Sequence, residues 1–377
     1  MIQFQRLHTY VATCILVLGA NGFAHAQIRV GQTTGLTGPV AASVKDINIG
    51  AKLYLDSVNE SGGINGQRIE MVSLDDKFEV PLAAANAKKL IADPAVVALF
   101  LTRGTPHAQA LLPLLEEGHI PLIAPSTGAM VLHNPVNPWV FNVRATYQLE
   151  AEKLTRQLGM SGLDQVAILY TNDSFGEDAT QGALKVFKEA GKTPALYEAI
   201  DRTKPDYTAA VQKIMAVRPV NIIIFGSAVS VADGVKALRA AGSRANVATL
   251  SNNASAGFVK ALGDNAAGII VSQVFPSERR ASLPMINEAV ALANSHKISP
   301  LTPAMIEGFA AAKVLVAGLK RAAKDGKGIS RATLVRAMET FNRVDIGGLE
   351  LSYSPTDHTG LDFSDLSIIG ANGTFRR

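Results

Sequence analysis

Residue types that carry enzyme chemistry are sparse in this chain, and their spacing does not match a catalytic or metal site. The sequence contains no GxSxG, HExxH, Walker lysine or GxGxxG motif, and these motifs mark nucleophiles, zinc sites and phosphate loops. Histidines beyond position 26 lie far apart, and surface or helix-capping roles are expected for them rather than metal binding. They are His107, His119, His133, His296 and His358. The pattern predicts a protein that is not an enzyme and that needs no cofactor or metal.

The first 26 residues have the three parts of a secretory signal peptide. Arg6 provides a positive charge, residues 10–18 form a short apolar run, and Ala24-His25-Ala26 is a cleavage site of small residues. The apolar run is well short of the ~20 residues that cross a bilayer, so the mature chain is expected to begin at Gln27. Cys14 lies inside the apolar run, which makes a lipid anchor the less favoured alternative. The mature protein is therefore expected in the periplasm, without its only cysteine.

Length and composition place the mature chain among large globular proteins. About 350 residues remain after cleavage, which is more than one hydrophobic core usually supports, so two domains are expected. The best later candidate for a membrane span, residues 305–319, is interrupted by Glu307 and Lys313 and suits an amphipathic helix. Lysines and arginines are scattered, and aromatic residues make up only 6% of the chain, which argues against nucleic-acid binding.

Short apolar runs rich in β-branched residues alternate with longer amphipathic stretches through the first part of the chain. This alternation is typical of βαβ units and predicts a parallel sheet covered by helices on both faces. Turn residues support the boundaries, since Gly62-Gly63 follows the first helix and Asn65-Gly66 precedes the second strand. The expected strands are 28–34, 67–76, 96–101 and 120–125, and the expected helices are 47–59, 81–91 and 106–117.

The same pattern restarts after residue 165 and predicts a second α/β lobe. In a doubly wound sheet, ligands bind at the carboxyl ends of the strands, so two facing sheets make a cleft lined by strand-end loops. Residues 284–341 are expected to be almost wholly helical, and a strand pair at 349–351 and 366–369 closes the chain. The second lobe is expected to contain strands 166–171, 195–200, 221–226, 247–251 and 268–275, with helices 177–190, 207–217 and 229–241.

Several stretches, taken together in their order and spacing, resemble the Leu/Ile/Val-binding family of extracytoplasmic solute receptors that serve ABC importers. The opening TTGLTGPVAASVKDINIGAKLYLDSVNESGGINGQRIEMVSLDD is similar to the first strand, Gly-Pro loop, helix and Gly-Gly-Ile-Asn-Gly turn of that family. Further similarity lies in LLEEGHIPLIAPSTGA, VFNVRATYQLEA, AILYTNDSFGED and the closing ANGT. The resemblance covers essentially the whole mature sequence.

The resemblance implies the type I periplasmic-binding-protein fold, in which two doubly wound, Rossmann-like α/β lobes are joined by three strand crossings. The implied crossings lie near 142–144, 274–276 and 349–351. The N-terminal lobe would then comprise residues 27–143 and 276–348, and the C-terminal lobe residues 144–275 and 349–377. The implied motion is closure of the lobes over a ligand about these crossings.

In amino-acid binders of the family, loops after the third and fourth strands hold the ligand carboxylate through hydroxyl and backbone N–H groups. The matching residues here are Arg103, Gly104, Thr105, Ser126 and Thr127. The three hydroxyl residues suit ligand contact and helix capping equally well. A guanidinium at the strand end can bind a carboxylate through two hydrogen bonds. The alternative for Arg103 is a solvated side chain or a salt bridge between the lobes.

Other matching positions depart from amino-acid binders. Ser43 stands where an aromatic residue is common in the first loop, and Ser227 lies where those binders have a tyrosine-containing strand end. Asn253 stands at the position of the acidic residue that pairs with an α-ammonium group. Because an unpaired buried ammonium costs several kcal/mol, a standard branched-chain amino acid is not the expected ligand.

Two aromatic positions complete the expected site. Phe175 stands where the family often has a tyrosine and suits the apolar body of an aliphatic or aromatic ligand, with ordinary packing as the alternative. Tyr147 follows the first crossing and either lines the cleft or packs against the hinge. Asp173 is expected to cap the helix that follows it.

The resemblance implies that the protein captures a small solute, with a carboxylate as the expected polar group, and delivers it to the permease of an ABC importer. A monomer is expected. A subunit that presents its ligand to a sensor kinase is an alternative, because fold alone does not separate transport from sensing. A secreted hydrolase on a related scaffold is the remaining alternative.

Overall fold

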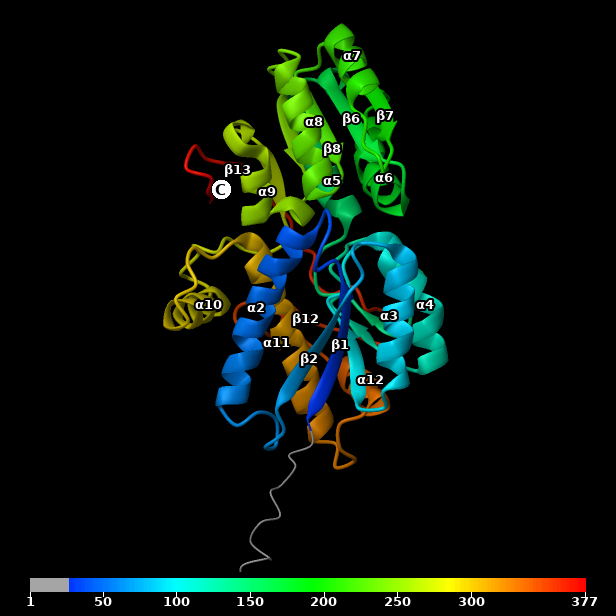
Figure 1. Ribbon diagram of the computed structural model, residues 1–377, viewed down its shortest axis with the longest axis vertical. Helices are drawn as coiled ribbons and strands as arrows, with labels where there is room; N and C mark the ends of the chain where they lie inside the picture. Colours follow the sequence, from blue (N-terminus) through cyan, green and yellow to red (C-terminus); the bar gives the residue numbers. More distant parts are fainter. Residues whose placement is uncertain (1–26) are drawn as a thin grey trace, which may run out of the picture.

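The computed structural model describes residues 27–377, so the predicted signal peptide lies outside the described residues. Two lobes are stacked along the long axis of the molecule (Figure 1), and each contains its own sheet with helices on both faces. This arrangement confirms the predicted fold class of two doubly wound α/β lobes. Within the described residues, no helix combines the length and the apolar character that crossing a membrane requires.

The first lobe contains the N-terminal strands and the three helices that follow residue 283. Its elements are β1 (Ile28–Thr34), α2 (Ala41–Glu60), β2 (Ile69–Asp75), α3 (Val80–Ala92), β3 (Val96–Phe100), α4 (Thr105–Gly118), β4 (Leu122–Ile123), β5 (Val140–Phe141), α10 (Pro284–Ser295), α11 (Pro303–Ala323), α12 (Arg331–Glu339), β11 (Val344–Asp345) and β12 (Glu350–Leu351).

The sheet of the first lobe has the parallel order β2-β1-β3-β4-β5. The inner strands β3 and β4 are buried on both faces, and successive residues therefore enter different cores. Leu99 and Leu122 pack against α3 and α4, whereas Phe100 and Ile123 pack against α2, α10 and α11. The order reverses beside β1, which places the loops after β1 and β3 at the switch point where such sheets bind ligands.

The second lobe repeats this design. Its elements are α5 (Tyr147–Leu158), β6 (Val166–Thr171), α6 (Ser174–Glu189), β7 (Leu196–Ile200), α7 (Thr208–Val217), β8 (Asn221–Phe225), α8 (Ala228–Ala240), β9 (Asn246–Thr249), α9 (Ala256–Leu262), β10 (Ile270–Gln273), β13 (Asp365–Ile369) and β14 (Phe375–Arg376).

The second sheet has the order β14-β13-β10-β9-β8-β6-β7 and is parallel from β10 to β7. Residues of β6 alternate between its two cores, since Ala167 and Leu169 face α7, α8 and α9 while Ile168 faces α5 and α6. The antiparallel strand β13 extends the sheet beside β10, and β14 pairs with the other edge of β13. The switch point of this sheet lies beside β6, so the loops after β6 and β8 point toward the first lobe.

Helix starts in the second lobe are fixed by side-chain caps. The side chains of Thr146, Asp173, Ser227 and Ser255 accept hydrogen bonds from backbone N–H groups in the first turns of α5, α6, α8 and α9. Each cap satisfies a donor that has no partner inside the helix. Two of these helices, α6 and α8, begin directly after a strand, so their caps also fix the loops at the cleft.

The third connection between the lobes differs from the expected one. Residues 349–351 were expected to cross between the lobes and to pair with 366–369, but β12 pairs instead with β11. Leu351, Tyr353 and Leu361 belong to the same core as β1, and β12 lies within the first lobe in Figure 1. At this third connection, the chain therefore passes to the second lobe between Leu361 and β13. It does not cross earlier, because the three apolar side chains are buried in the core of the first lobe.

Candidate functional site

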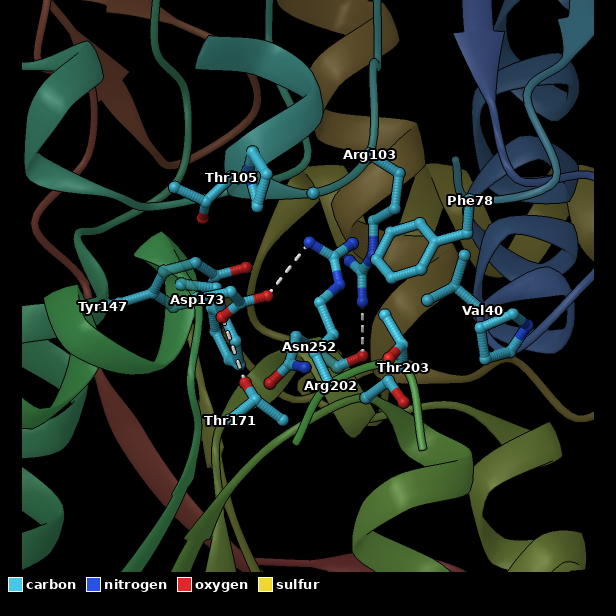
Figure 2. A pocket seen from close by; sticks show the side chains of 15 residues that line it. Val40, Phe78, Arg103, Thr105, Tyr147, Thr171, Asp173, Arg202, Thr203 and Asn252 are labelled. Atoms are coloured by element: carbon cyan, nitrogen blue, oxygen red, sulfur yellow. Dashed lines mark hydrogen bonds and ion pairs between the residues drawn. The ribbon is translucent and has the colours of Figure 1, made fainter. Parts of the chain in front are cut away.

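A cavity of about 170 Å³ lies where the carboxyl ends of the two sheets face each other (Figure 2). The first lobe contributes the loops after β1, β2 and β3, and the second lobe contributes the loops after β6, β7, β8 and β9. A pocket at facing switch points is the expected place for a ligand in this architecture. It is lined by Pro39, Val40, Phe78, Arg103, Gly104, Thr105, Pro106, Tyr147, Thr171, Asp173, Phe175, Arg202, Thr203, Ser227 and Asn252.

Arg103 extends from the end of β3 and is buried in the closed cleft. Its Nη1 donates to Oγ of Ser126 at 2.9 Å, and its Nη2 donates to the backbone carbonyl of Asn252 at 2.7 Å. Asn252 belongs to the other lobe, so the guanidinium joins the two lobes. Among residues 27–377, no carboxylate oxygen lies within 4.0 Å of this guanidinium. Arg103 is thus a buried cation on the cavity without a direct anionic partner.

Ser126 connects Arg103 to a buried charge network at the first crossing. Its hydroxyl donates to Glu307 of α11 at 2.9 Å, and Glu307 lies 3.6 Å from Arg144. Arg144 also donates to Glu150 at 2.5 Å and to the Ser251 hydroxyl at 2.6 Å. Burial by itself would lower the pKa of Arg144, but the nearby carboxylates outweigh burial and hold the pKa above its ordinary value. Arg144 therefore stays charged, and its contacts tie the hinge to both lobes.

Phe78 presents its ring to the cavity from an uncommon backbone conformation. Its φ of 62° lies in the left-handed region, where a bulky side chain is strained. The Asp76 carboxylate holds this turn by accepting from the Phe78 N–H at 2.9 Å and from the Thr33 hydroxyl at 3.1 Å. Burial raises the pKa of Asp76 to about 6. A strained residue fixed by its neighbours in this way is typical of a binding site.

His107 supports the Phe78 ring from behind. The two rings stack with centroids 4.4 Å apart. Burial, followed by the positive charges of Arg202 and Arg103, lowers the pKa of His107 to about 4. Gly104 allows this packing, because a Cβ atom there would lie 2.8 Å from both rings. The stack is therefore uncharged at neutral pH.

In the second lobe, charged and aromatic side chains meet the cavity from the start of α5 and from the segments that follow β6 and β7. Asp173 lies 3.0 Å from Arg202, whose guanidinium lies over the Phe78 ring at 4.6 Å. The rings of Tyr147 and Phe175 pack edge to face with centroids 4.9 Å apart. The cavity wall thus combines three aromatic rings with two arginines and one carboxylate.

The structure brings six of the predicted site residues to the cavity wall and leaves four away from it. Ser126 and Thr127 lie one layer behind, where Thr127 pairs with the Thr105 hydroxyl at 2.8 Å. Ser43 is turned into its own helix and donates to the Val40 carbonyl. Asn253 is buried and donates to the Gly226 carbonyl and the Thr249 hydroxyl. The six on the wall are Arg103, Gly104, Thr105, Tyr147, Phe175 and Ser227.

The sequence interpretation missed several wall residues. Asp173 caps α6, as predicted, yet its carboxylate also lines the cavity. Asn252, rather than Asn253, faces the cavity. Phe78 follows β2, and Arg202 follows β7. Ligands bind at the carboxyl ends of parallel strands, so the loops after β2 and β7 could have been included in the predicted site on the same ground as the others.

Predicted roles of hydroxyl and histidine residues also need correction. Thr105 does not cap α4, because Gly104 occupies that position. His119 and His296 do end helices, as expected. His107, His133 and His358 are buried instead, and His107 and His358 stack on the rings of Phe78 and Phe141. The described residues contain no group of three or more acidic, histidine or cysteine side chains arranged for a metal ion.

Comparison with known proteins agrees with this architecture. A model of the periplasmic binding protein family matches residues 27–362. The Leu/Ile/Val-binding protein BraC3 of Rhizobium johnstonii is 25% identical over 331 residues, covering 86% of this chain and 88% of that protein. A crystal structure of a substrate-binding periplasmic protein from Ralstonia solanacearum is 29% identical, with a TM-score of 0.84 and coverage of 93% of this chain and 99% of that one.

A more distant structural neighbour shares the fold alone. The fatty acid ABC transporter substrate-binding protein from Thermomonospora curvata is 21% identical, with a TM-score of 0.83, and the match covers 94% of this chain and 91% of that one. Proteins described as binding different solutes therefore share this fold, and the cavity must decide the ligand. The chain belongs to the type I periplasmic binding proteins of the Leu/Ile/Val-binding family, which confirms the resemblance found in its sequence.

Proposed function

We propose that this protein captures a small carboxylate-bearing solute between its lobes and delivers it to an ABC importer. The observation that carries the proposal is the Arg103 guanidinium, which is buried on the cavity wall without a carboxylate partner within 4.0 Å among the described residues. A ligand carboxylate would give Arg103 a direct anionic partner in a desolvated place, where charge-assisted hydrogen bonds are strong.

The rest of the wall suits the apolar body of such a solute. Phe78, Tyr147 and Phe175 provide rings, and Val40 adds an aliphatic surface. Pockets of this kind bind a ligand through apolar burial and orient it with a few polar groups. We therefore propose an aromatic or branched aliphatic acid as the solute class.

Binding without chemical conversion is part of the proposal. The described residues on the cavity wall include no histidine, lysine or glutamate, and the family relatives are described as binding proteins. We further propose that the protein acts as a monomer in the periplasm, and that the closed pair of lobes forms the surface read by the permease.

A ligand screen tests capture. Thermal shift followed by calorimetry would compare carboxylic acids with their primary amides and with α-amino acids, for example 3-phenylpropanoate with its amide and with phenylalanine. We expect the acid to bind and raise the melting temperature, and the amide to have little effect. Equal binding of acid and amide would show that a carboxylate is not recognised.

A second experiment tests delivery. The ligand-loaded protein would be added to proteoliposomes that contain the permease and ATPase encoded beside its gene. Stimulated ATP hydrolysis and uptake of the acid would support import. Activation of a neighbouring sensor kinase, without uptake, would assign the protein to sensing instead.

A further inference from the structure

Asp173 is the one carboxylate among the described residues that line the cavity. Its Oδ1 accepts from the Gly176 N–H at 2.9 Å and from the Thr171 hydroxyl at 3.1 Å, which fixes the side chain at the start of α6. Its Oδ2 lies 3.0 Å from Nη1 of Arg202. A solute with an ammonium group would need this carboxylate as its counterion, because an unpaired buried ammonium is costly.

The guanidinium of Arg202 occupies the position beside Asp173 that a ligand ammonium group would need. It extends from the loop after β7 toward the first lobe and lies between Asp173 and the Phe78 ring in Figure 2. Its side chain is 19% exposed and that of Asp173 is 13% exposed, so the pair is largely removed from water. The cation–π contact with Phe78 at 4.6 Å adds a second attachment, to the other lobe.

The charged side chains on the cavity wall then decide which charged groups of a solute find a partner of opposite charge. Asp173 and Arg202 compensate each other, and Arg103 remains as a positive charge without a carboxylate partner. A monoanion can pair directly with Arg103, which reaches the Glu307 carboxylate only through the Ser126 hydroxyl. A zwitterionic amino acid adds an ammonium group for which no free carboxylate remains on the wall.

We propose that Arg202 is a specificity-determining residue that occupies the ammonium position at Asp173, so that the cavity accepts carboxylic acids without an α-ammonium group and rejects α-amino acids. The inference rests on the proposed capture of a carboxylate at Arg103. It assigns to Arg202 a separate role, which is to exclude α-amino acids, whereas Arg103 attracts the carboxylate.

The test compares matched pairs of ligands in Arg202→Met, which keeps an unbranched but shorter side chain and removes its charge. Calorimetry would measure 4-methylpentanoate against leucine and 3-phenylpropanoate against phenylalanine. In the unmodified protein we expect each acid to bind at least about 100-fold more tightly than its amino acid, which corresponds to about 2.7 kcal/mol. In Arg202→Met we expect this ratio to fall at least tenfold, through tighter binding of the amino acid.

Three variants control the test. Lys204→Met removes an exposed cation from the same loop and should leave the ratio unchanged. The double variant Arg202→Met with Asp173→Asn lacks the carboxylate and should lose the gain in amino-acid binding. Arg202→Lys keeps a cation beside Asp173 and should retain discrimination, which also tests the proposal if Arg202→Met fails to fold.

The outcomes separate this inference from the proposed function. An unmodified protein that binds leucine as tightly as 4-methylpentanoate overturns the role of Arg202, although capture at Arg103 stands. If Arg202→Met weakens acids and amino acids equally, Arg202 is a closure or ligand contact and the inference is wrong. Failure of all carboxylic acids to bind the unmodified protein overturns the proposed function, and this inference with it.

Discussion

Gly257 of α9 and Ala42 of α2 meet across the cleft so closely that a Cβ atom on Gly257 would lie 2.0 Å from the Cβ of Ala42. The lobes are held together beside this contact, where the Asp46 carboxylate of the first lobe accepts from the Ala256 N–H of the second at 2.9 Å. The structure therefore shows a closed arrangement of the lobes. Any side chain at position 257 must push the lobes apart.

Substitution of Gly257 should impair closure without unfolding either lobe. In Gly257→Val we expect acid affinity to fall at least tenfold, because the closed form becomes unfavourable while the open form does not. Small-angle scattering should show that the acid found in the ligand screen reduces the radius of gyration of the unmodified protein but not of the variant.

Lys260→Val is the matched control, because Lys260 is exposed on the same helix. It should retain both affinity and compaction. Undiminished compaction of Gly257→Val on adding ligand would contradict the closure mechanism. Superimposable scattering of the unmodified protein with and without ligand would do so as well.

Arg103→Met should remove the proposed anion anchor. We expect binding of the acid to weaken by at least about 1.5 kcal/mol, which is the lower range for a hydrogen bond to a charged group. Calorimetry on Arg68→Met, which removes an exposed arginine, provides the comparison. Unchanged affinity in Arg103→Met, with the melting temperature preserved, would remove Arg103 from the binding site.

Arg144→Met should destabilise the protein strongly. The substitution leaves the buried carboxylates of Glu150 and Glu307 without their cation, and breaking a buried pair in this way costs about 3–5 kcal/mol. Urea unfolding would measure the loss. The exposed pair of Arg343 and Glu350 supplies the control, since Arg343→Met should change the free energy of unfolding by less than about 1 kcal/mol. Similar effects of the two substitutions would show that the hinge network contributes little to stability.

Asp76→Asn should stabilise the protein above pH 6. Burial raises the pKa of Asp76 from 3.8 to about 6 in the folded state. Between these values the folded protein binds more protons than the unfolded chain, so this group lowers the free energy of unfolding as pH rises, by up to about 1.4 kcal/mol per pH unit. The asparagine removes that dependence and keeps an acceptor for the Phe78 N–H.

Urea unfolding of both proteins at several pH values checks the prediction. The advantage of Asp76→Asn should be largest at pH 7 to 8 and should shrink toward pH 4. His107 and His133, whose pKa values are lowered to about 4, oppose folding as pH falls below 6.5 in both proteins, so the difference between the two curves isolates Asp76. A difference that does not depend on pH would show that Asp76 is ionised without penalty.

Much of the fold could be predicted because the local sequence determines where helices and strands form. The alternation of apolar runs and amphipathic stretches fixed the parallel sheets, their restart fixed the number of lobes, and side chains such as Ser227 and Ser255 cap helices that the sequence already suggested. The places of Arg103 and Phe175 near strand ends could likewise be predicted from the nearby sequence. The carboxyl ends of parallel strands lie along one edge of the sheet, which is where ligands bind.

The pairing of residues across the cleft was decided only by the tertiary structure. Arg103 meets the carbonyl of Asn252, and Phe78 meets Arg202, although each pair belongs to different lobes and is far apart in the sequence. The same holds for the third connection, where burial of Leu351 and Leu361 in the first lobe moved the crossing toward the C-terminus. Periodicity reports which face of an element is buried, but the partner of a charge or a ring depends on how two separately folded lobes close against each other.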